Sequence, residues 1–204
     1  LGLSITVDGA TLTAPQSFTW APGSSHTIAT PSPQGTGTRQ MFATWSDGGA
    51  ASHIVTAPAT ATTYTANFST QYLLTTAATA GGSLAVSPTS LDGYYASGTS
   101  VQLTATANAG NTFTNWSGDL TGATNPRSVI LSAPRTVTAN FSAPAGVTVT
   151  TNPTGLSISV DGAILTAPQS FSWAAGSSHT IATTSPQGIG GARQVFVRWS
   201  DGGA

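Results

Sequence analysis

The sequence contains no cysteine, no lysine and no glutamate. Without cysteine, the chain can form neither a disulfide bond nor a cysteine-ligated zinc site. Without lysine, it cannot be crosslinked by isopeptide bonds that start from a lysine amine. Most acid–base and nucleophilic mechanisms also lose their usual side chains when these three residue types are absent. We therefore predict that the chain is not an enzyme and that it binds no cofactor.

Charged side chains of either sign are also rare. They make up 5% of the residues, against roughly 25% in an average soluble protein. All five basic residues are arginine, all six acidic residues are aspartate, and the net charge is −1. Such a chain lacks the basic surface that attracts nucleic acids and anionic membranes. No apolar run approaches the roughly 20 residues that span a bilayer. We predict no nucleic-acid partner and no insertion into a membrane.

The main feature that is present is an internal repeat. Residues 2–34 and 155–187 align at a fixed offset of 153 with five substitutions, and both copies continue to a Trp-Ser-Asp-Gly-Gly segment. Self-similarity at a fixed period is the signature of repeat architectures. A more divergent unit lies between the two copies and carries the same Phe-x-x-Trp-Ser anchor at residues 113–117. The chain therefore consists of related units in the order A, B, A′.

Two recurring anchors give the length of one unit. Trp45 of the first anchor recurs as Trp116, and Asn67 of the second anchor, Thr-Ala-Asn-Phe-Ser, recurs as Asn140. The two anchors give a period of about 70–75 residues. This period divides the chain into module A (1–69), module B (70–143) and module A′ (144–204).

The first and last modules differ in extent. The segment 147–154 of module A′ has no counterpart before Gly2, and the segment 52–68 of module A has none after residue 204. We expect module A to lack an N-terminal strand and module A′ to be truncated at its C-terminus.

Alternation of apolar and polar residues predicts short, half-buried strands. The clearest runs are residues 3–7, 18–20, 64–68, 101–107 and 137–141, and no stretch of ten residues has helical periodicity. Breakers rich in glycine, proline and asparagine separate these runs. We expect five to seven strands in each module, with short links at 69–71 and 143–146. The expected core residues are Phe42, Trp45 and Phe68 in module A, and Phe113, Trp116 and Phe141 in module B.

Module B also carries an ordered series of motifs. They are Gly81-Gly82-Ser83-Leu84, the segment 93–105, Phe113 to Asp119, Asn125-Pro126 and Val137 to Phe141. Over about residues 72–141 this series resembles the bacterial repeat domain related to the internalin B-repeat family, and the flanking modules resemble a divergent variant. The resemblance implies a β-grasp-like fold, no shared catalytic residues, and an extracellular or cell-surface location.

The strand pattern and the resemblance together define the expected fold class. It is all-β, with tandem small β-sandwich or β-grasp-like modules, one to each repeat period, and no substantial helix.

Aromatic side chains are the candidate binding residues. Trp20, Tyr94, Tyr95 and Trp173 could stack on sugar rings, or one of each neighbouring pair could pack inward. The Trp45-Ser46-Asp47-Gly48-Gly49 segment could bind a cation or a sugar, but a core tryptophan followed by an Asp-Gly turn is the favoured interpretation. The same reasoning applies to Asp119.

Metal and catalytic sites have little support in the sequence. Calcium usually needs several carboxylates, and the six aspartates give about two to each module. Ser25-His26 and Ser178-His179 are adjacent pairs, but adjacency does not make a catalytic dyad, because such sites are recognised by geometry. We predict no catalytic, metal or cofactor-binding residues.

The favoured function is a structural repeat array of an extracellular or cell-surface bacterial protein, as a stalk, an adhesin shaft or a filament subunit. The expected partners are neighbouring repeats, and further copies through self-assembly at edge strands. The alternative is a carbohydrate-binding accessory region of a secreted enzyme, with glycans as partners.

Overall fold

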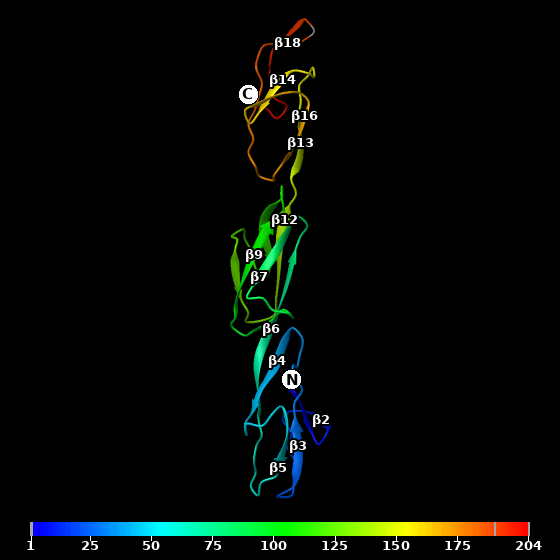
Figure 1. Cartoon of the computed structure of the whole chain (residues 1–204), viewed down its shortest axis with the longest axis vertical. Coiled ribbons are helices and arrows are strands. Elements are labelled where there is room, and N and C mark those ends of the chain that lie inside the picture. The colour runs from blue at the N-terminus through cyan, green and yellow to red at the C-terminus, as the bar shows by residue number, and fades with distance from the viewer. Residues whose placement is uncertain (1, 190, 204) are drawn as a thin grey trace. The chain divides into compact units, whose positions relative to one another are not determined.

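The computed structural model describes residues 2–189 and 191–203, which form strands, turns and loops (Figure 1). The described part of the chain contains no helix, which confirms the all-β prediction. Among these residues there is accordingly no helix that could cross a membrane. The chain divides into two compact units. The first comprises residues up to 77, 84–104 and 116–138, and the second comprises 78–83, 105–115 and the residues from 139 onward.

Module A begins with a four-stranded sheet, drawn in blue to cyan in Figure 1. Its order is β2-β1-β3-β5, built from β1 (Ser4–Val7), β2 (Ala10–Thr13), β3 (Ser25–Ala29) and β5 (Ser52–Thr56). The β1–β2 hairpin turns at Asp8 and Gly9, whose φ angles are 50° and 82°. Two positive φ angles define the type I′ turn, for which Asp-Gly is a preferred pair. Val7, Ile28, Trp45 and Val55 form the buried apolar cluster of this module.

A second sheet contains the longest strand, β6 (Ala66–Ala78). Its order is β10-β12-β6-β4, with β8 also paired to β6; the other members are β4 (Thr38–Trp45), β8 (Tyr94–Ala96), β10 (Thr112–Gly118) and β12 (Arg135–Ser142). Residues 69–71, the expected link between modules A and B, lie inside this strand. Gln71 pairs with Arg39 on β4 and with Ala96 on β8, so a neighbour on each side keeps its backbone extended.

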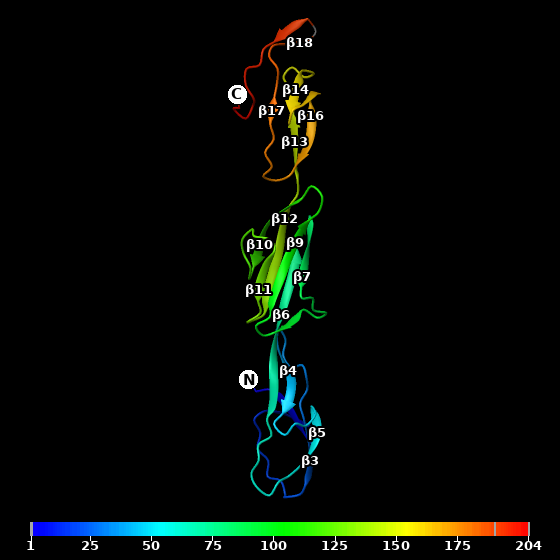
Figure 2. The same cartoon turned by 60° about the vertical axis from the view of Figure 1, so that its left-hand side comes forward.

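Figure 2 shows the remaining sheet of module B, where β9 (Ser100–Ala107) lies between β11 (Arg127–Ile130) and β7 (Gly82–Ser87). Alternate residues of β9 are buried, as its sequence pattern predicts. Trp116 is 1% exposed and Trp45 is 4% exposed, which confirms both as core residues. The predicted core phenylalanines are only half-buried, and they meet edge to face, with centroids 6.1 Å apart for Phe42–Phe68 and 5.8 Å for Phe113–Phe141.

Module A′ repeats the hairpin of module A and adds a sheet of two strands, β13 and β16. Its elements are β13 (Ala145–Val149), β14 (Ser157–Val160), β15 (Ala163–Thr166), β16 (Gln169–Trp173), β17 (Ile181–Ala182), β18 (Gln187–Ile189) and β19 (Ala192–Gln194). They form sheets of order β13-β16, β15-β14-β17 and β18-β19. The alternating run 18–20 of module A was also predicted to be a strand, and this is wrong: only its copy in module A′, within β16, pairs with a neighbour.

Candidate functional site

The cluster that most resembles a reactive site joins the β1–β2 turn to the start of β3 in module A. Asp8 and Thr27 bond through their backbones, with Asp8 N donating to Thr27 O at 2.8 Å. Thr27 N donates in return to Asp8 Oδ1 at 2.8 Å. This reciprocal pair fixes the carboxylate of Asp8 beside the side chain of His26.

Three side chains meet at this point. Asp8 Oδ2 lies 2.7 Å from His26 Nδ1, and Ser24 Oγ lies 2.8 Å from His26 Nε2. Ser24 and His26 point the same way because side chains two residues apart lie on one face of an extended backbone. The order of contacts, serine to histidine to aspartate, is that of a catalytic triad.

The electrostatics of the cluster favour an ionised carboxylate. The hydrogen bond from His26, followed by the hydrogen bond from the Thr27 backbone, holds the pKa of Asp8 below its ordinary value of 3.8. The Asp8 side chain is half exposed to solvent, whereas that of His26 is mostly covered. The histidine is thus held between an anion on one side and a hydroxyl on the other.

The proton of the serine hydroxyl shows what this cluster can do chemically. Ser24 Oγ donates to Ala21 O at 2.7 Å and lies 2.8 Å from His26 Nε2. A nucleophilic serine has to donate its proton to the histidine instead. The nearby backbone donors are also engaged, because Gly23 N donates to Ala57 O and Ser24 N donates to Ala21 O. The cluster therefore has the geometry of a turn clamp, with its donors directed into the fold.

Module A′ contains the same clamp. Ser177 Oγ lies 2.8 Å from His179 Nε2 and donates to Ala174 O at 2.7 Å, and His179 Nδ1 lies 2.7 Å from Asp161 Oδ2. The hydrogen bond from His179 again lowers the pKa of Asp161. Two copies with the same contacts show that these positions are part of the repeat itself.

The two tryptophans predicted as glycan contacts lie against these histidines. Trp20 stacks on His26 with ring centroids 4.0 Å apart, and Trp173 stacks on His179 at 4.2 Å. Phe18 stacks in turn on Trp20 at 5.4 Å, and Phe18 is 46% exposed. One face of each indole is therefore covered by an imidazole ring.

The two tyrosines of the prediction lie in β8 of module B. Tyr95 is buried, and its hydroxyl donates to Pro88 O at 2.9 Å. Tyr94 is half-buried: its hydroxyl accepts a bond from Gly37 N at 3.0 Å, and the Arg39 guanidinium carbon lies 3.8 Å from its ring centroid. Arg39 also pairs with Asp92 at 2.6 Å, and that bond lowers the pKa of the Asp92 carboxyl. Glycan contact at these four aromatic residues stays a prediction.

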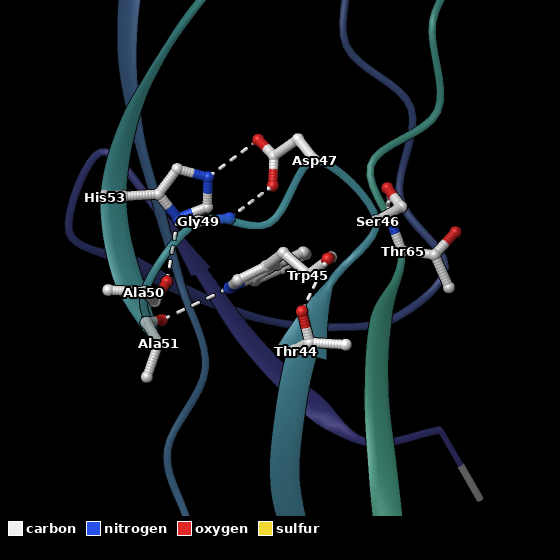
Figure 3. A network of polar contacts seen from close by, with 9 residues as sticks. All are labelled: Thr44, Trp45, Ser46, Asp47, Gly49, Ala50, Ala51, His53 and Thr65. Carbon is white, nitrogen blue, oxygen red and sulfur yellow. Dashed lines mark hydrogen bonds and ion pairs between the residues drawn. The ribbon is translucent and has the colours of Figure 1, made fainter.

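Figure 3 shows the Trp-Ser-Asp-Gly-Gly segment of module A. Asp47 accepts bonds from Gly49 N at 3.1 Å and, at 2.9 Å, from the ring of His53. The His53 bond is the main cause of a lowered pKa at Asp47. Trp45 packs edge to face on His53, with centroids 5.9 Å apart. The segment is a core tryptophan followed by an Asp-Gly turn, as the favoured interpretation predicts.

Module A has a groove beside its aromatic stack. It has a volume of about 590 Å³ and is lined by residues 16–20 and 57–64 together with core residues that include Val7, Ile28 and Trp45. The described residues contain no group of three or more histidine and aspartate side chains that could hold a metal ion.

Sequence reasoning missed the partners of the histidines. It considered the adjacent Ser25, whereas the hydroxyl that reaches His26 belongs to Ser24, and it did not connect His26 with Asp8. The available signal was the Ser-x-His spacing at the same offset as the Asp-Gly turn in both copies of the repeat.

The comparisons with known proteins identify only the middle of the chain. No curated protein and no solved structure matches the chain. Residues 72–145, which include β7 to β12, match the family of the divergent InlB B-repeat domain.

Proposed function

We propose that this chain is part of a structural repeat array of an extracellular or cell-surface bacterial protein, serving as a stalk, an adhesin shaft or a filament subunit. The observation that carries the proposal is the repetition of residues 2–34, with their hairpin and their turn clamp, as residues 155–187 at an offset of 153. The match of residues 72–145 to a bacterial repeat domain supports it.

The chemistry of the repeated polar cluster agrees with a non-enzymatic role. A catalytic site presents a serine whose proton is shared with the histidine, and backbone N–H groups directed at the reacting oxygen. In module A the hydroxyl and both nearby N–H groups bond to carbonyl oxygens of the fold. These groups stabilise turns, which is what a structural module needs from its polar residues.

Small-angle scattering on arrays of different length tests the proposal. Inserting one more copy of residues 2–154 gives the order A, B, A, B, A′. For a stiff array, the maximum dimension grows in proportion to the number of modules while the cross-section stays constant. The radius of gyration of a compact particle instead rises only with about the 0.38 power of the number of residues. Compact scaling, or the scaling of a flexible coil, would reject a structural array.

Glycan binding is the second candidate, and the exposed ring of Phe18 beside a groove favours it. Sugar rings commonly stack on exposed aromatic faces. On a glycan array, binding that is lost in Trp20→Ala or Tyr94→Ala would favour this function over a purely structural one.

A further inference from the structure

A cluster of four side chains connects module A to module B beside β6, the strand that the two modules share. Arg39 belongs to β4 of module A, and its three partners, Gln71, Asp92 and Tyr94, belong to module B. All four residues lie in the first compact unit of the chain. Each contact of Arg39 in this joint cluster therefore crosses from one module to the other.

The guanidinium group of Arg39 uses both its face and its edge. Its central carbon lies 3.8 Å from the centroid of the Tyr94 ring. At its edge, Nη1 lies 2.6 Å from Asp92 Oδ2, and Nε donates to Gln71 Oε1 at 2.8 Å. A planar guanidinium can stack on an aromatic ring while its fork of donors binds other groups. The Arg39 side chain is only 15% exposed, so these contacts are screened less than those of an ordinary surface ion pair.

The partners of Arg39 are themselves held in place. Asp92 Oδ1 accepts a bond from Tyr94 N at 3.1 Å, which leaves Oδ2 for the arginine. The Tyr94 hydroxyl accepts a bond from Gly37 N, and Gly37 O accepts one from Leu73 N at 2.8 Å. The tyrosine is therefore bound by the backbone of module A at its hydroxyl and by Arg39 at its ring face.

The junction between modules B and A′ has different residues at the equivalent positions. The equivalence follows from the anchors, which align Phe42 with Phe113 and Asn67 with Asn140, and from the strand pairs Tyr72↔Tyr95 and Ala145↔Trp173. The positions of Arg39, Gln71, Asp92 and Tyr94 are held there by Gly110, Pro144, Ser170 and Ser172. These four residues have neither a charge nor an aromatic ring, so the joint cluster is particular to the A–B junction.

We propose that Asp92 and Tyr94 form a docking surface on module B for the arginine of an A-type module, and that this contact locks the joint between the two modules. The arginine recurs as Arg193 in module A′, so it is a feature of the A-type unit. A single shared strand can still bend and twist. The joint cluster adds a connection through side chains beside that strand. This inference rests on the proposed function, because a stiff array needs locked joints.

Spin labels on the two modules test the lock directly. Because the chain has no cysteine, two introduced cysteines are its only thiol labelling sites. Ile54→Cys on β5 and Ser128→Cys on β11 replace exposed residues in sheets that do not include β6. The distance distribution between these labels, measured by double electron–electron resonance, therefore reports on the joint. It should be narrow in the labelled parent chain and broader in Arg39→Gln and in Asp92→Asn.

The choice of variants separates the lock from general effects on the fold. Asp92→Asn removes only the charge, because the amide oxygen can still accept the bond from Tyr94 N. Arg39→Gln combined with Asp92→Asn should be no broader than Arg39→Gln alone, because substitutions at two partners of one contact are not additive. Asp119→Asn is the matched control. It removes a carboxylate that lies 3.4 Å from Arg135 within module B, and it should leave the width unchanged.

Three results would overturn the proposal. One is a distribution of equal width in the parent chain and in both single variants, while slow amide exchange in β9 shows that module B is folded. Another is equal broadening in Asp119→Asn. The third is a double variant whose broadening is the sum of the two single effects. If Arg39→Gln does not fold, the width in Asp92→Asn decides. The scattering test of the array stays separate, because β6 joins the two modules in every variant.

Discussion

At the scale of single residues, the hydrogen-bonded aspartates determine how the protein responds to acid. The pKa values of Asp8, Asp47, Asp92 and Asp161 are lowered, in each case mainly by a bond from a histidine or arginine side chain. A carboxyl whose folded pKa lies below its unfolded value stabilises the fold above the unfolded pKa. That contribution is lost as the pH falls through the lower, folded value.

We predict that replacing both clamp aspartates reduces this acid sensitivity. In Asp8→Asn with Asp161→Asn, the amide oxygen can still accept the backbone bond, and asparagine tolerates the positive φ of both positions. The urea midpoint of the natural chain should fall between about pH 5 and pH 2, and that of the variant should fall less. If the urea midpoints of the natural chain and the variant fall equally with pH, the lowered pKa values of Asp8 and Asp161 do not contribute to stability.

Individual residues also show what the sequence could predict. Trp45 and Trp116 were identified as core residues because each belongs to a recurrent anchor, and a large apolar ring in a small module has to be buried. The phenylalanines of the same anchors are half-buried, since a module of this size has little interior. The link from His26 to Asp8 is a contact across 18 residues, and spacing along the chain does not determine such contacts.

At the scale of the elements, hydrophobic alternation located strands well but could not tell which of them have partners. The runs 18–20 and 171–173 are nearly identical in sequence, yet only the second lies in a strand, because β13 is beside it. Likewise, residues 69–71 carry no strong strand signal, and pairing with β4 and β8 makes them part of β6. Strand formation depends on neighbours as well as on local sequence.

The continuity of β6 leads to a second prediction. Gln71 has a paired strand on each side, so its backbone N–H faces either β4 or β8. Gln71→Pro removes that donor and leaves its acceptor unpaired, which should destabilise the fold by about 1–3 kcal/mol. Gln71→Ala is the matched control, because it keeps the N–H and loses only the side-chain bond from Arg39 Nε. Urea unfolding measures both variants. Equal midpoints for the two would mean that β6 is not held by its pairing at this point.

At the scale of the whole molecule, the hydrogen-bonded sheets connect the modules unequally. β6 pairs with β4 of module A and with β8 of module B, so these two modules share one sheet. Among the described strands, those of module A′ pair only with one another, between residues 145 and 194. Loss of β6 removes pairing from both modules that it joins, whereas the sheets of module A′ do not include it.

We therefore predict that modules A and B unfold together and that module A′ unfolds separately. Amide exchange in increasing urea should give one opening midpoint for β4 and β9, because a shared strand couples their stabilities. β14 should open at a different midpoint, and Gln71→Pro should shift the first midpoint while leaving that of β14 unchanged. If β4 and β9 open independently, β6 does not couple the two modules. If β14 shifts with them, a contact outside the sheets must connect module A′ to the rest of the chain.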